Sequence, residues 1–181
     1  MKVLIRLAAA LAFVLAVAAP TLSFAAPAPH LLLTLKDGTV DIELEPDLAP
    51  KTVKQIETLT EQGFYNGLTF HRVIDGFMAQ TGDPNGDGTG HSSLPNVPAE
   101  FTDTPFVRGT VGMARAQDPN SGNSQFFIMF GDGPQLTGQY TVFGKVVSGM
   151  QYVDAIKRGD PADNGMVTDP DHIVSAKIVN E

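Results

Sequence analysis

Eight short apolar segments, separated by stretches that contain glycine, proline, aspartate or asparagine, limit the folds open to this 181-residue chain. In the segment Val40–Leu44, apolar side chains alternate with Asp41 and Glu43, which is the period of a strand with one solvated face. Short strands with few helical connections are typical of antiparallel barrels and sandwiches. The expected strands are Leu31–Leu35, Val40–Leu44, Thr69–Ile74, Phe77–Gln80, Thr110–Ala114, Gln125–Phe130, Thr141–Val147 and Ile173–Val179.

Two segments have a helical period instead. Between Pro50 and Gln62, apolar residues recur at three-residue spacing, proline suits the first turn, and Gly63 suits the C-terminal cap. A second, shorter helix is expected over Met150–Lys157, with Gly159 after it. The chain is therefore predicted to be mostly β, with two helices.

The first 25 residues are typical of a cleaved secretory signal peptide. Lys2 and Arg6 precede an unbroken apolar run, Leu7–Ala19, and small residues lead up to Ala25. Thirteen helical residues span about 20 Å, short of the ~30 Å hydrocarbon core, so a transmembrane anchor is disfavoured and no stable membrane insertion is expected. The predicted folded domain is residues 26–181.

Charge and cysteine content exclude several classes of function. The chain has 12 basic and 20 acidic residues, and the first 25 residues hold two of the basic ones and none of the acidic ones. The acidic remainder repels phosphate backbones, so no nucleic-acid partner is expected. The chain has no cysteine, which excludes disulfides, thiolate metal sites and cysteine nucleophiles and suits an oxidising compartment.

No local motif predicts a metal ion or cofactor. The four histidines form no HExxH or H-x₃-H pair. The stretch Asp83–Gly88 resembles the start of a calcium loop, but Leu94 stands where a bidentate glutamate is needed, so a glycine-rich surface turn is favoured. His71 lies in an apolar strand and is interpreted as a core histidine with one ring nitrogen bonded to the backbone.

Arg72 is the most informative charged residue, because it sits inside the apolar segment Phe70–Ile74. An arginine there must reach solvent, pair with a carboxylate, or bind a ligand. Spacing alone favours the salt bridge or an extended, solvent-seeking side chain.

Longer motifs around Arg72 favour a role in binding a ligand. Several motifs resemble the cyclophilin family of peptidyl-prolyl isomerases. They are FHRVIDGFMAQTGD at residues 70–83, GMARA at 112–116, Pro119-Asn120, SQFFI at 124–128 and the stretch from Leu136 to Gly144. The order of elements is similar over almost all of residues 31–181. The resemblance implies an eight-stranded antiparallel β-barrel closed by two α-helices.

The resemblance also assigns roles to residues. Arg72 matches the catalytic arginine. The positions matching the substrate-binding groove are the proline pocket Phe77, Met78, Phe127 and Leu136, the polar Gln80 and Gln125, the peptide-binding segment Ala114, Arg115 and Ala116, and the rim residue Tyr140. The resemblance implies that no cofactor is needed.

Three positions depart from the best-known eukaryotic pattern. Arg115 replaces a common asparagine, Gln135 a common tryptophan and Tyr140 a common histidine. The presence of Gln135 in place of tryptophan predicts weak binding of cyclosporin, because the site for this drug in the family overlaps the peptide groove. A simple hairpin turning at Asp75-Gly76 would place Arg72 and Gln80 on opposite faces, so a bulge or an offset pairing is expected.

The predicted function is isomerisation of Xaa-Pro bonds in unfolded or partly folded exported polypeptides, which assists their folding. We expect a monomer in the periplasm, or a secreted protein where no outer membrane exists. Two alternatives are open: a peptide-binding holdase that has kept the groove without catalysis, and a secreted serine hydrolase with a triad assembled from distant residues. The hydrolase lacks support from a G-x-S-x-G elbow, which the sequence does not contain.

Overall fold

One antiparallel sheet of eight strands organises the molecule, in the order β3-β4-β6-β5-β7-β2-β1-β8. A computed structural model describes residues 28–180, so the predicted signal segment and its boundary lie outside the described residues. The strands are β1 (Pro29–Leu35), β2 (Gly38–Leu44), β3 (Arg72–Ile74), β4 (Met78–Thr81), β5 (Thr110–Met113), β6 (Phe126–Met129), β7 (Val142–Ser148) and β8 (Ser175–Asn180). All eight expected strands are confirmed, with ends shifted by up to three residues.

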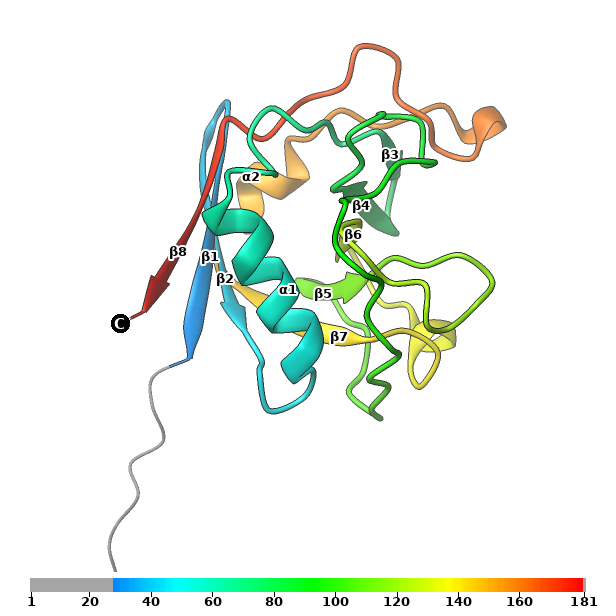
Figure 1. Cartoon of the computed structure of the whole chain (residues 1–181). Helices are drawn as coiled ribbons and strands as arrows, with labels where there is room; N and C mark the ends of the chain where they lie inside the picture. Colours follow the sequence, from blue (N-terminus) through cyan, green and yellow to red (C-terminus); the bar gives the residue numbers. More distant parts are fainter. Residues whose placement is uncertain (1–27, 181) are drawn as a thin grey trace, which may run out of the picture.

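The sheet curls into a half-barrel, and irregular backbone joins its two ends. Figure 1 shows β8, β1 and β2 on one side and β3, β4 and β6 on the other. The segments that precede the two end strands, 67–70 and 171–173, pair with each other. Gly67 N–H donates to Ile173 O at 2.7 Å, and Phe70 N–H donates to Asp171 O at 2.8 Å. Closure therefore uses these paired segments in place of a ladder between β3 and β8.

Helix α1 (Pro50–Glu61) lies across the concave side of the sheet (Figure 1). Its buried face includes Val53, Ile56 and Leu59, the three apolar residues that predicted it. Glu100 stabilises its start, because its two carboxylate oxygens accept from the backbone N–H groups of Lys51 and Thr52 at 3.0 and 2.9 Å. The chain thus satisfies two of the N–H groups that a helix start leaves unpaired.

Helix α2 (Met150–Asp154) is shorter than the predicted Met150–Lys157. Its end has a clear cause: the backbone N–H of Lys157 donates to the Asp171 carboxylate at 2.8 Å and not to a helical carbonyl. Two single 3₁₀ turns complete the elements, η1 (Pro134–Leu136) and η2 (Pro161–Asp163). No helix in residues 28–180 has the length and apolar character needed to cross a bilayer.

The alternation of side chains along β6 separates two apolar clusters. Phe126 and Ile128 belong to the main core between the sheet and the helices. Phe127 and Met129 point to the other face, where they join Met78, Phe106 and Val142. This second cluster forms the base of the candidate site.

Candidate active site

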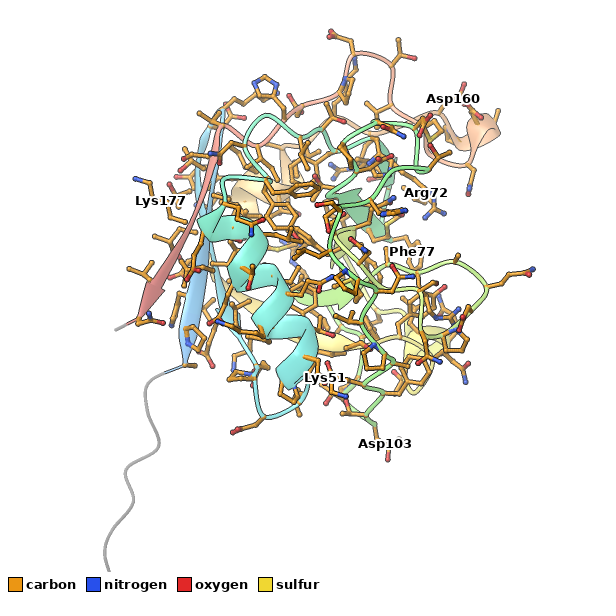
Figure 2. The ribbon with its side chains drawn as sticks, in the orientation of Figure 1. Lys51, Arg72, Phe77, Asp103, Asp160 and Lys177 are labelled. Carbon is orange, nitrogen blue, oxygen red and sulfur yellow. The ribbon has the colours of Figure 1, made fainter. Side chains whose placement is uncertain are left out.

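An open pocket lies over the second cluster, where β3, β4 and β6 meet the segments that follow β5 and contain η1. Nine of the eleven predicted site residues line it: Arg72, Phe77, Met78, Gln80, Ala114, Arg115, Phe127, Leu136 and Tyr140. Figure 2 shows Arg72 and Phe77 on the same side of the molecule. The structure thus brings together residues spread over almost seventy positions of sequence.

The hairpin β3–β4 places Arg72 directly opposite Gln80. The register pairs Arg72 with Gln80, Val73 with Ala79 and Ile74 with Met78, so three residues form the loop. Residues opposite each other in an antiparallel pair share a face of the sheet. The expected offset pairing is confirmed: Phe77 belongs to the loop, its N–H donates to Ile74 O at 3.0 Å, and Gly76 turns the chain at φ +68°.

Aromatic rings form the apolar wall of the pocket. Phe127 is 5% exposed and stacks on Phe106 with ring centroids 5.7 Å apart. The ring of Tyr140 meets Phe127 edge-on at 5.9 Å. Gly112 is required beneath them, because a Cβ at this position would lie 2.6 Å from atoms of both Phe106 and Phe127.

The Arg72 guanidinium is held by neutral acceptors. Its Nη1 donates to Gln80 Oε1 at 3.2 Å, its Nε to the Asn164 carbonyl at 3.0 Å, and its Nη2 to Asn164 Oδ1 at 3.1 Å. Among the residues that the structure describes, no carboxylate lies within ion-pair distance of it. The salt bridge favoured by spacing alone is therefore wrong. Burial lowers the pKa of Arg72, which still leaves this group charged at neutral pH.

A hydrogen-bonded chain extends from Arg72 along the groove. Gln80 Nε2 donates to Gln125 Oε1 at 2.8 Å, and Gln125 Nε2 donates to the carbonyls of Gly90 and Gly88 at 2.7 and 3.1 Å. The last two predicted residues, Ala116 and Gln125, line an adjoining hollow that shares Gln80, Ala114 and Arg115 with the pocket. The two hollows form one continuous groove with the cationic Arg72 in its apolar half.

Arg115 stabilises one rim of the groove. Its guanidinium lies 4.5 Å from the centre of the Tyr140 ring, and its Nη2 donates to the Gln139 carbonyl at 3.1 Å. This contact joins two of the three positions that depart from the common family pattern. Gln135, the third, is exposed on η1 beside Leu136.

Three residues of the site were missed by the sequence reasoning: Asn164, Phe106 and Gly112. Phe106 and Gly112 lie beneath the pocket, and their part in it depends on packing across strands. Asn164 is 92 residues from Arg72 in the chain. Its only local signal is the Asn-Gly pair typical of a turn, which carries no information about a distant arginine.

Two further predictions concern the residues next to the site. The surface turn at Asp83–Gly88 is confirmed, because the buried Asp83 carboxylate accepts from the backbone N–H groups of Asn85, Asp87 and Gly88. His71 is a core residue, 1% exposed. The expected ring hydrogen bond to the backbone does not reach normal geometry: neither ring nitrogen has a partner at that geometry among the described residues, and the backbone of Thr69 is the nearest polar group acting on the ring.

Comparisons with known proteins place the chain in one family. A family model described as "Cyclophilin type peptidyl-prolyl cis-trans isomerase/CLD" matches residues 30–178. A probable peptidyl-prolyl cis-trans isomerase of Brucella suis is 60% identical over 172 residues, covering 89% of this chain and 88% of the relative. Peptidyl-prolyl cis-trans isomerase B of Bacillus subtilis is 44% identical over 129 residues, covering 70% of this chain and 89% of the relative.

Solved structures agree with the fold. A cyclophilin-type isomerase of Cryptosporidium parvum, determined in the presence of the dipeptide Ala-Pro, superposes with a TM-score of 0.77. It is 30% identical and covers 84% of this chain and 99% of its own. The chain belongs to the cyclophilin-type peptidyl-prolyl cis-trans isomerase family and is an enzyme of that class.

Proposed function

We propose that this isomerase acts on exported polypeptides, with Arg72 as its catalytic group and the pocket beside it as the binding site for proline. One observation carries the assignment of the site: no carboxylate of residues 28–180 pairs with the charged Arg72, which lies beside a pocket lined by Phe77, Phe127 and other apolar side chains. A guanidinium paired with a carboxylate would have its charge compensated; here its attraction for a lone pair is retained.

The reaction requires rotation about a bond with partial double-bond character. Amide resonance gives the prolyl bond a barrier of about 18–20 kcal/mol, and this resonance is lost in the twisted transition state. The proline nitrogen then gains a lone pair that can accept a hydrogen bond. Arg72 would stabilise the twisted state more than the planar one, which is the condition for catalysis.

Arg72 alone does not supply the whole effect. A hydrogen bond from a charged donor contributes about 1.5–3 kcal/mol, or roughly 10- to 150-fold in rate. A millionfold acceleration needs about 8 kcal/mol. The remainder must come from a preorganised site: the rings of Phe77 and Phe127 hold the proline while the preceding carbonyl rotates, and Gln80 keeps the guanidinium in place.

Export is supported by the sequence of the first 25 residues. The described sheet begins at Pro29, so removal of these residues takes nothing from it. We propose the periplasm as the location where an outer membrane exists, with unfolded, proline-containing exported chains as substrates and a monomeric enzyme.

Fractionation tests the location. The full chain, expressed in a Gram-negative host, should appear in the periplasmic fraction with a new N-terminus at Ala26. The matched control is the double variant Leu11→Arg, Val14→Arg, which interrupts the apolar run and should remain in the cytoplasm at full length. Cytoplasmic retention of the unaltered chain at full length would contradict export and leave the isomerase assignment unaffected.

A further inference from the structure

We propose that Asn164 is a positioning residue for the isomerase reaction, because it fixes the plane of the Arg72 guanidinium at the edge of the proline pocket. Both acceptors of one residue engage Arg72: the Asn164 carbonyl accepts from Nε at 3.0 Å and Oδ1 accepts from Nη2 at 3.1 Å. Nε and Nη2 form one side of a rigid planar fork, so two parallel bonds to them determine orientation as well as position.

The backbone of Asn164 is shaped to present both acceptors. The residue ends η2 in the left-handed conformation, at φ +50° and ψ +30°, which asparagine tolerates better than most residues. Asp160 fixes the start of the same turn, where its side chain accepts from Ala162 N–H at 2.8 Å. Gly165 N–H also donates to Asp160 O at 2.8 Å, so hydrogen bonds within the segment hold the turn without the participation of Arg72.

The segment carrying Asn164 is bound to the strand carrying Arg72. Val73 in β3 bonds the segment through both of its backbone groups: its N–H donates to Gly165 O at 2.7 Å, and its carbonyl accepts from Gly159 N–H at 2.9 Å. Next to β3, the carbonyl of His71 accepts from Val167 N–H at 3.0 Å. Figure 2 shows Asp160, at the start of this segment, on the same side of the molecule as Arg72. Asn164 is thus held against β3 by hydrogen bonds on both of its sides in sequence.

These contacts determine what Arg72 can offer a substrate. A guanidinium has five N–H donors, and three of them are bound by Gln80 and Asn164 in the part of the chain that the structure describes. Without the Asn164 side chain, the Nη2 contact disappears and the fork can rotate about its remaining contacts. The misorientation would weaken a bond that forms only in the twisted transition state, so kcat should fall while KM, set by the apolar pocket, should not.

The test uses Asn164→Gly, which removes Oδ1 and keeps both the backbone carbonyl and the left-handed conformation. Its matched control is Asp169→Gly, because Asp169 is the other non-glycine residue with positive φ in residues 28–180, at +54°, and it does not contact Arg72. The measurements are kcat and KM for the cis form of an Ala-Pro tetrapeptide, and the 15N order parameter of Arg72 Nε. The inference rests on the proposed catalytic role of Arg72, so Asn164→Gly is also made in an Arg72→Ala background.

We expect Asn164→Gly to lower kcat five- to tenfold with KM within twofold, to lower the Arg72 order parameter, and to have no further effect on Arg72→Ala. Asp169→Gly should match the unaltered enzyme. A kcat within twofold of the unaltered enzyme, or an equal loss in the Arg72→Ala background, would overturn the inference. If instead Arg72→Ala alone retains full turnover, the catalytic role of Arg72 is wrong, and an unchanged order parameter in Asn164→Gly would then also contradict the positioning role.

Discussion

Arg72 Nη1 donates to Gln80 Oε1 at 3.2 Å, and this single contact fixes the orientation of two amide side chains. Because a guanidinium only donates, the oxygen of Gln80 must face it, and the amide nitrogen must face Gln125. The oxygen of Gln125 then accepts from Gln80, and its nitrogen donates to the Gly88 and Gly90 carbonyls. The arginine and the loop at the far end of the groove are therefore coupled through two glutamines.

Removing the middle of this chain should weaken catalysis without abolishing it. Gln80→Ala leaves Arg72 its two contacts with Asn164, so we expect a loss in kcat of about fivefold, equivalent to one net hydrogen bond of ~1 kcal/mol. Steady-state assays with an Xaa-Pro peptide measure it. Gln151→Ala, which removes an exposed amide on α2, is the control and should keep normal kcat. An unchanged kcat in Gln80→Ala would mean that Gln80 does not support the arginine.

Gly112 should tolerate no side chain. In Gly112→Ala the new methyl group would lie 2.6 Å from both Phe106 and Phe127, so at least one ring must shift, and Phe127 lines the pocket. Overpacking of this kind costs about 1–3 kcal/mol of stability. We expect a lower melting temperature and a KM raised about tenfold.

A second change tests the cause of the Gly112 effect. Phe106→Leu makes room beneath the pocket without touching its predicted lining, so the double variant Gly112→Ala, Phe106→Leu should recover part of the KM. If Gly112→Ala alone binds peptide normally, the position of the Phe127 ring does not determine proline binding.

His71 should make folding stability depend on pH in the weakly acidic range. Burial is the main cause that lowers the pKa of His71 below its usual 6.5. Asp83, the backbone of Thr69 and Asp87 act in the opposite direction, and Arg72 adds to the lowering. At a pH between the folded and unfolded pKa values, His71 therefore binds a proton in the unfolded chain and not in the folded chain. Stability is complete above pH 6.5 and is lost as pH falls toward the folded pKa, by at most ~1.4 kcal/mol per pH unit.

Urea unfolding between pH 7.5 and 5 measures this dependence. His71→Leu should be at least as stable as the unaltered chain at pH 7.5, because the buried imidazole that it removes has no hydrogen bond of normal geometry to any described residue. Its stability should change little down to pH 5. The aspartates whose pKa is lowered by pairing, such as Asp154 beside Arg108, lose their contribution only below about pH 4. An equal pH slope in His71→Leu would contradict the assignment to His71.

Gln135 should limit the affinity for cyclosporin. It is exposed on η1 beside the pocket residue Leu136, where the family pattern has a tryptophan. If ~80 Å² of apolar contact is missing at ~25 cal/mol per Å², the loss is about 2 kcal/mol, or thirtyfold in Kd. Calorimetry should show weak binding to the unaltered enzyme and a large gain in Gln135→Trp, with peptide turnover little changed. Tight binding without the substitution would show that Gln135 does not stand on the drug-binding rim.

The sequence predicted the strands and α1 well because their periods are local properties. Val40, Ile42 and Leu44 alternate with polar residues, and the structure buries all three on one face. Helix α2 was predicted too long because its end depends on Asp171, which is distant in sequence. The pairing of segments 67–70 and 171–173 was missed for the same reason, since a strand period does not tell which distant segment a strand pairs with.

The candidate site could likewise be predicted only where the signal is local in the sequence. Motif resemblance identified Arg72 and the ten groove residues, and the structure brings them together around one groove. From spacing alone, Arg72 was expected to pair with a carboxylate or to extend to solvent; three-dimensional packing gives it Gln80 and Asn164 as partners instead. Long-range hydrogen bonds, as between Arg72 and Asn164, leave no periodic trace in a single sequence.

The catalytic role of Arg72 is the central claim, and one protease-coupled assay of cis–trans isomerisation on an Ala-Pro peptide tests it most directly. Arg72→Ala should lose at least tenfold in kcat/KM with an unchanged far-UV spectrum and melting behaviour. Arg72→Lys should not restore activity, because a point charge lacks the planar fork held by Gln80 and Asn164. Turnover equal to the unaltered enzyme in either folded variant would contradict the account.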